Sequence, residues 1–129
     1  MADIKHHVLV VDDEPLNRDL MCRLLSRSYE LSDAGSVHEA LMLLTGDGPQ
    51  VDIIICDQLM PGGNGTDLAV EVRERWPEIH FILVTGFDGE PEVVGAERDG
   101  LIDAVVLKPW RSAKLRELIA ATLAAASPD

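Results

Sequence analysis

The fold is decided by a stretch near the amino end of the chain, Val8-Leu9-Val10-Val11-Asp12-Asp13-Glu14-Pro15. It begins with four apolar residues, three of them β-branched. Such a run is typical of a strand buried on both faces of a parallel sheet. An acidic pair ends the run, and the proline that follows favours the first turn of a helix. A strand followed directly by a helix is the repeating unit of α/β proteins, so we expect the unit to recur.

The unit does recur along the whole chain. Three more short apolar runs are bounded by Asp, Gly or Pro: Ile53-Ile54-Ile55-Cys56, Phe81-Ile82-Leu83-Val84 and Ala104-Val105-Val106-Leu107. The segments between them each present one apolar stripe at helical spacing. The pattern predicts strands at 6–11, 28–33, 51–56, 79–84 and 103–107, and helices at 15–27, 37–46, 65–76, 90–99 and 111–125. We therefore expect a doubly wound α/β fold, a five-stranded parallel sheet flanked by five helices.

Two of the predicted helices carry start signals. Ser36 and Glu39 have the spacing of a capping box. Asp13 stands before Pro15 and is expected to cap the first helix, with the proline in its opening turn.

Length and composition limit the organisation of the protein. A chain of 129 residues has room for one domain. We expect that domain at 1–126, with 127–129 as a tail or the start of a linker. The composition, 47% hydrophobic and 26% charged, is that of a folded globular protein.

Charge and cysteine usage exclude several functions. The chain has 23 acidic and 11 basic residues, and its net charge of −12 repels phosphate backbones and anionic lipid. We therefore expect no direct contact with nucleic acid or membrane. Cys22 and Cys56 are too few for a disulfide scaffold and are expected as reduced, buried thiols. The amino end also lacks an apolar signal segment, so the predicted location is cytoplasmic.

Polar residues follow four of the predicted strands: Asp12 and Asp13, Asp57, Thr85, and Lys108. Ligands of parallel α/β sheets bind beyond the carboxyl ends of the strands, where these residues would gather. Two carboxylates about 4 Å apart repel by about 4 kcal/mol at an effective dielectric near 20, so a cation must balance three of them. Carboxylates, a carbonyl and water suit Mg²⁺, whose coordination phosphate oxygens complete.

The same residues could carry out phosphoryl chemistry. Lys108 offers a positive charge and Thr85 a hydroxyl to phosphoryl oxygens. The remaining carboxylate is free to act as a nucleophile that forms an aspartyl phosphate.

These motifs resemble a known family. The first stretch, together with Cys56-Asp57-Gln58-Leu59-Met60-Pro61, the following Gly65, Val84-Thr85-Gly86 and Leu107-Lys108-Pro109, is similar to the receiver domain of two-component response regulators. The resemblance covers nearly the whole chain and implies a flavodoxin-like sheet with strand order 2-1-3-4-5. It also implies that Asp57 is the phosphoacceptor and that Mg²⁺ is held by Asp12, Asp13, Asp57 and the backbone carbonyl of Leu59. Thr85 and Lys108 would contact the phosphoryl group.

The resemblance also implies partners. The phosphoryl donor would be a phosphohistidine on a sensor histidine kinase or a phosphotransfer protein. The chain would catalyse its own phosphorylation, with room for a slow autophosphatase activity, and would not be an enzyme with an external substrate. The signal would pass through the surface of residues 90–125 to a C-terminal output domain or to a separate downstream protein.

The chain departs from the family pattern in two places. Many receivers carry Tyr or Phe three residues before the lysine that follows the last strand, and this chain has Val105. Gly63 stands where Met is common, which predicts a loosened loop before the helix at 65–76. Receivers commonly have a cis bond after that lysine, so we expect the bond between Lys108 and Pro109 to be cis.

Two other functions fit the same carboxylates. A small phosphohydrolase would also form an aspartyl phosphate, but such enzymes usually have a second acid where Leu59 stands. A pseudo-receiver that only binds a partner would take up no phosphate. Stoichiometric labelling without turnover distinguishes the receiver from both. Whether the domain acts alone or within a longer protein stays open.

Overall fold

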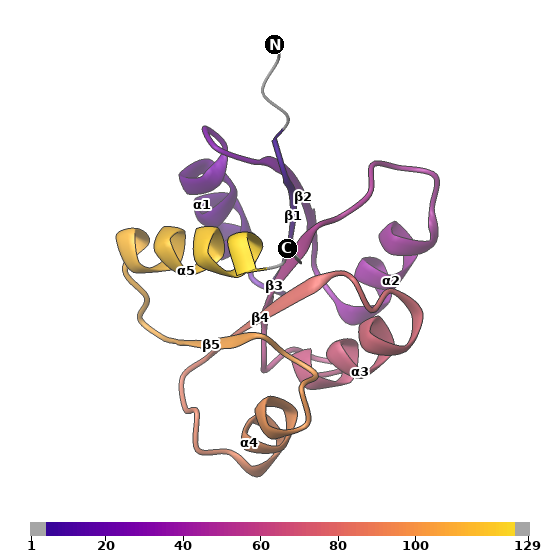
Figure 1. Cartoon of the computed structure of the whole chain (residues 1–129), viewed down its shortest axis with the longest axis vertical. Helices are drawn as coiled ribbons and strands as arrows, with labels where there is room; N and C mark the ends of the chain where they lie inside the picture. The colour runs from indigo at the N-terminus through magenta and orange to yellow at the C-terminus, as the bar shows by residue number, and fades with distance from the viewer. Residues whose placement is uncertain (1–4, 126–129) are drawn as a thin grey trace.

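The computed structural model describes residues 5–125, in which strands and helices alternate (Figure 1). In chain order the elements are β1 (His7–Val11), α1 (Pro15–Leu25), β2 (Glu30–Ala34), α2 (Val37–Thr45), β3 (Ile53–Asp57), α3 (Gly65–Arg75), β4 (His80–Thr85), α4 (Pro91–Arg98), β5 (Ala104–Leu107) and α5 (Ser112–Ala125). All strand pairs are parallel, in the order β2-β1-β3-β4-β5. The predicted fold is confirmed; the predicted domain end at residue 126 and the tail at 127–129 lie outside the described residues.

The sheet separates two apolar cores. Figure 1 shows α1 and α5 on one side of the sheet and α2, α3 and α4 on the other. Successive residues of β1 enter opposite cores: Val8 packs with the α1 and α5 side, and Leu9 with the α2, α3 and α4 side. Every residue of β1 and β3 is buried. Burial on both faces explains why these strands are continuous apolar runs rather than alternating ones.

The predicted element boundaries need small corrections near α1. The helix ends at Leu25, two residues early, because the backbone amides of Ser28 and Tyr29 both donate to the Leu25 carbonyl and turn the chain toward β2. The predicted cap by Asp13 is wrong. The N-cap residue is Glu14, whose backbone amide donates to Asp12 Oδ1 at 2.9 Å.

The start signal of α2 is confirmed in part. Ser36 Oγ accepts a hydrogen bond from the Glu39 amide at 3.1 Å, as a capping residue does. The Glu39 carboxylate, however, accepts from the amide of Gly35 at 2.6 Å. The second half of the box is therefore displaced by one residue.

Within residues 5–125, no helix has both the length and the apolar character that crossing a membrane requires.

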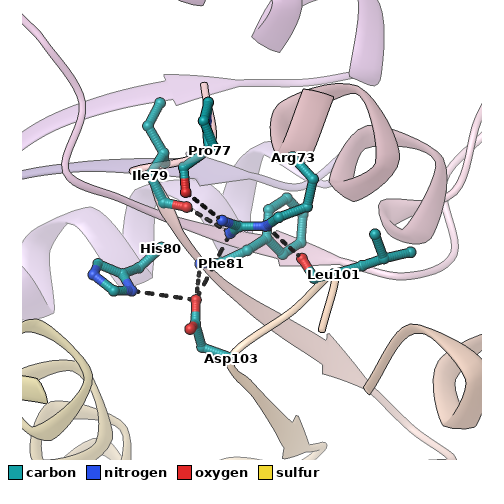
Figure 2. Close-up of polar contacts among 7 residues, drawn as sticks. All are labelled: Arg73, Pro77, Ile79, His80, Phe81, Leu101 and Asp103. Atoms are coloured by element: carbon teal, nitrogen blue, oxygen red, sulfur yellow. Dashed lines mark hydrogen bonds and ion pairs between the residues drawn. The ribbon is translucent and has the colours of Figure 1, made fainter. Parts of the chain in front are cut away.

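One arginine ties the end of α3 to the start of the last two strands. Arg73 donates to the backbone carbonyls of Pro77 at 2.7 Å, Ile79 at 2.5 Å and Leu101 at 3.1 Å (Figure 2). Its Nη2 also lies 3.8 Å from the Asp103 carboxylate. These contacts lie at the edge of the sheet where the strands begin, opposite the edge that carries Asp57. The guanidinium thus holds together the two loops that lead into β4 and β5.

We expect Arg73→Met to lower the free energy of unfolding by about 2 kcal/mol or more, because hydrogen bonds to a charged group contribute about 1.5–3 kcal/mol and three carbonyls lose their donor. Urea unfolding measures the loss. The matched control is Arg23→Met, which removes an exposed pair with Asp19 on α1 and should cost under about 0.5 kcal/mol. Equal losses in the two variants would contradict this role for Arg73.

Candidate functional site

The sheet brings the predicted site residues to one edge. Asp57 ends β3, Thr85 ends β4, and Asp12 and Lys108 directly follow β1 and β5. The Lys108 amide donates to the Thr85 carbonyl at 2.9 Å, which continues the sheet by one residue at this edge. The bond between Lys108 and Pro109 is cis, as expected.

Three carboxylates converge there. Asp12, Asp13 and Asp57 each offer one oxygen, and these oxygens all lie within 4.8 Å of one another. Asp57 is buried, Asp12 is nearly so, and Asp13 is exposed. The clustering expected from the strand ends is therefore present, and it concentrates negative charge where solvent screens it least.

Lys108 is the cation nearest to this cluster. Its Nζ lies 2.5 Å from Asp57 Oδ1. Burial raises the pKa of the Asp57 carboxyl; the close ammonium group of Lys108 opposes this rise, and the charges of Asp12 and Asp13 add to it. The balance leaves the Asp57 pKa above its ordinary value. Ionised Asp57 is thus only partly compensated by the protein itself.

The donor set fits a divalent cation. Among residues 5–125, Asp57 Oδ1 is the buried side-chain oxygen without a hydrogen bond of acceptable geometry, so Lys108 meets it as an ion pair. An oxygen in this state can accept a metal ion without losing a hydrogen bond. Hard oxygen ligands that carry excess negative charge are the ligands Mg²⁺ prefers. Leu59, whose carbonyl is the fourth expected ligand, lies two residues beyond Asp57 with its side chain 63% exposed.

Gly65 allows the loop after Asp57 to return close to β3. A Cβ at this position would lie 2.7 Å from the Asp57 carbonyl oxygen and 2.6 Å from Leu83 Cδ1. The Gly65 amide donates to the Gln58 carbonyl at 2.9 Å and fixes the start of α3. Any side chain here would push the helix away from the strand that carries Asp57.

Thr85 is held loosely. Its side chain is buried, and its hydroxyl lies 3.3 Å from the Phe87 amide and 3.4 Å from the Phe87 carbonyl. Both distances are at the long end for hydrogen bonds. The hydroxyl can therefore turn to another acceptor at low cost.

Sequence reasoning missed Arg18. Its Nη1 donates to the Asp12 carbonyl at 2.7 Å, and its Nε pairs with Asp33 at 3.0 Å, so it holds the end of β1 against the end of β2. The sequence gives only a slight indication of this role: Arg18 is a basic residue one turn into the helix that follows the acidic pair.

A pocket of about 460 Å³ adjoins the carboxylates. Asp12, Asp57 and Lys108 line its polar end, while Leu20 of α1 and Trp110 line its apolar side. The site is thus open to a ligand that approaches between α1 and the chain after β5.

The two cysteines differ. Cys56 is buried, its thiol donates to the Asp57 carbonyl at 3.2 Å, and burial raises its pKa well above the usual value. Cys22 is also free but only partly buried, so the expectation of two buried thiols is wrong for Cys22. Cys22 packs against the core on the α1 and α5 side without being enclosed by it.

Comparisons with known proteins agree with this geometry. The family model of the response regulator receiver domain matches residues 8–120. The hydrogenase transcriptional regulatory protein HoxA of Cupriavidus necator is 38% identical over 110 residues, which are 85% of this chain and 22% of HoxA. The chain belongs to the receiver domains of two-component response regulators, and it spans about a quarter of the length of the HoxA proteins that it matches.

Solved structures show the same fold. The signal receiver domain of an HD domain-containing protein from Pseudomonas fluorescens aligns with a TM-score of 0.87 at 26% identity, over 95% of this chain and 98% of that one. The response regulator protein TrrA of Thermotoga maritima, crystallised in complex with Mg²⁺ and BeF, aligns with a TM-score of 0.77 at 29% identity, over 91% of this chain and 98% of that one.

The raised pKa of Asp57 predicts the pH dependence of stability. A folded-state pKa above the unfolded one means that the folded protein binds this proton more tightly. Stability therefore falls as pH rises from the unfolded-state pKa to the folded-state pKa, and the loss stays constant above it. In metal-free buffer at pH 7, Asp57→Asn should therefore unfold at higher urea than the wild type. The difference should shrink as pH falls through the raised folded-state pKa of Asp57 and should vanish below about 4, the ordinary range for Asp.

Urea titrations in EDTA at neutral and acid pH measure this difference. Asp47→Asn, in an exposed turn, is the matched control for loss of one negative charge. If Asp57→Asn is less stable than the wild type at pH 7, the raised pKa of Asp57 is contradicted.

Proposed function

We propose that Asp57 accepts a phosphoryl group, with Mg²⁺ bound by Asp12, Asp13, Asp57 and the Leu59 carbonyl. The observation that carries the proposal is the buried Asp57 carboxylate, which lies beside two other carboxylates and 2.5 Å from Lys108 Nζ. The complex of TrrA with Mg²⁺ and BeF supports it by similarity.

The donor is a phosphohistidine on a sensor histidine kinase or a phosphotransfer protein. An Asp57 oxygen attacks phosphorus as the bond between phosphorus and the donor imidazole nitrogen breaks, and the electron pair of that bond stays on the imidazole. Bound Mg²⁺ supplies positive charge to the phosphoryl oxygens. Lys108 turns from Asp57 Oδ1 to a phosphoryl oxygen, and the Thr85 hydroxyl donates to another. The two free cysteines fit a cytoplasmic location.

Output passes through α4, β5 and α5. Val105 packs against the core on the α4 side and has no ring that could swing between two positions. The aromatic ring near this face is that of Phe87, on the loop after β4. It lies against Gly89, where an added Cβ would be 2.7 Å from Phe87 Cζ. The helix that follows has eight residues and contains Gly95, so α4 is the weak element on this face. The receiver of the signal is a C-terminal output domain or a separate downstream protein.

Intact mass spectrometry with a small phosphodonor and Mg²⁺ tests the phosphoacceptor. The wild type should gain one phosphoryl group per chain and should not go on to consume further donor. Asp57→Asn or added EDTA should abolish the gain. Asp47→Asn should be labelled like the wild type. Full labelling of Asp57→Asn would overturn the assignment, and sustained release of phosphate would favour a phosphohydrolase.

The lifetime of the phosphoryl group tests the surroundings of the site. Leu59 and Phe87 are large apolar residues, 63% and 62% exposed, on the loops after β3 and β4. Apolar side chains at these positions exclude attacking water, so Leu59→Asn and Phe87→Glu should each hasten hydrolysis several-fold. Loss of the label is followed by mass after removal of the donor. Met42→Gln, an equally exposed residue on α2, should leave the rate unchanged; unchanged rates in all three variants count against the proposal.

A further inference from the structure

A buried glutamine follows Asp57 and is not used by the chemistry above. Gln58 has no exposed surface, which is unusual for an uncharged polar side chain of this size. Its Oε1 accepts from the Thr66 amide at 2.9 Å, and its Nε2 lies 3.3 Å from Thr66 Oγ1. Thr66 Oγ1 in turn lies 3.4 Å from Oε2 of Glu92. A chain of side-chain hydrogen bonds therefore runs from the residue after Asp57, through the first turn of α3, to the first turn of α4.

The direction of this chain is fixed by its chemistry. The Thr66 amide can only donate, so the oxygen of the Gln58 amide faces it and the NH₂ group faces the threonine hydroxyl. The hydroxyl then accepts from Gln58, and its single proton points to the Glu92 carboxylate. All members of the chain are thereby polarised in one direction, toward α4.

The backbone of Gln58 joins this chain to the site. Its amide donates to the Val84 carbonyl at 2.9 Å, next to Thr85, and its carbonyl accepts from Gly65 at the start of α3. A shift of Asp57, of Thr85 or of the loop that carries Leu59 must therefore move Gln58. The two contacts of the Thr66 hydroxyl are long, so a small shift strengthens or breaks them.

We propose that the Gln58–Thr66–Glu92 hydrogen-bond chain couples occupancy of the Asp57 site to the order of α4, with Gln58 as a positioning residue. The inference rests on the proposed function. It supplies a path from the site to α4 in a chain whose β5 carries Val105 in place of the aromatic residue that many receivers have there. Glu92 also lies in the first turn of α4, where a negative charge favours the helix.

The first test separates coupling from phosphorylation. Hydrogen exchange of residues 91–98 is measured with and without phosphodonor and Mg²⁺, and labelling is measured by mass in the same samples. We expect protection of α4 to rise in the wild type, and the rise to be about 2- to 30-fold smaller in Thr66→Val, the range typical of couplings of this kind. Thr66→Ser, which keeps the hydroxyl, should restore the response.

The outcomes are distinct. If Thr66→Val is labelled fully and its α4 responds like that of the wild type, the coupling is overturned while the proposed function stands. If the wild type takes up no label, the proposed function fails, and the coupling is judged by metal binding alone.

The second test uses reciprocity. A residue of α4 that is coupled to the site must change the affinity of the site for Mg²⁺. Mg²⁺ titrations followed by the fluorescence of Trp110, which lines the pocket beside Asp57, should give a dissociation constant changed at least about 2-fold in Glu92→Gln. Glu90→Gln removes the same charge from the N-cap of α4, without a side-chain bond to the helix, and should leave the constant unchanged. Equal constants in the wild type and Glu92→Gln would overturn the coupling.

Discussion

A buried carboxylate beside two others is stable only when positive charge stands near it, and the edge of the sheet is arranged around that constraint. One ammonium, that of Lys108, cannot balance Asp12, Asp13 and Asp57 together. The pKa of Asp57 stays raised in spite of the close lysine, because burial outweighs it. The folded protein therefore carries negative charge at this edge that its own side chains do not balance, and the proposed Mg²⁺ would neutralise that charge.

The two edges of the sheet differ in how completely their polar groups are satisfied. At the edge where the strands begin, Arg73 binds three carbonyls, and Asp103 accepts from the Phe81 amide at 2.8 Å and lies 3.4 Å from His80 Nδ1 (Figure 2). At the other edge, Asp57 Oδ1 has no well-formed hydrogen bond and the Thr85 hydroxyl has only long ones. One edge is fixed, and the other has polar atoms available for a ligand.

Most of the fold follows from the sequence because both faces of the central strands are buried, and that leaves unbroken apolar runs. The carboxyl-edge cluster follows for a related reason, since parallel strands end at the same side. The positions of β2 and of the end of α1 do not follow, because a turn around the Leu25 carbonyl decides them and no side-chain periodicity marks it. The cap of α1 also does not follow, because the Asp12 carboxylate, rather than that of Asp13, accepts from the Glu14 amide at the start of the helix.

The polar contacts that lie behind the site were the least predictable part. Gln58 occupies a position where a solvated side chain is the ordinary expectation, and its burial depends on Thr66, eight residues away across a loop. Arg18 is one of two arginines on α1, and only its contacts with the Asp12 carbonyl and with Asp33 distinguish it from Arg23. Such pairings depend on how two elements approach each other, which spacing along the chain does not encode.

Cys56 lies in the middle strand of the sheet, directly before Asp57, with its thiol inside the core on the α2, α3 and α4 side. A thiol that is both inaccessible and held protonated does not react with an alkylating reagent. It becomes reactive only when β3 separates from its neighbours. In a variant with Cys22 replaced by serine, the rate of maleimide modification of Cys56 would therefore report how often the strand that carries Asp57 opens.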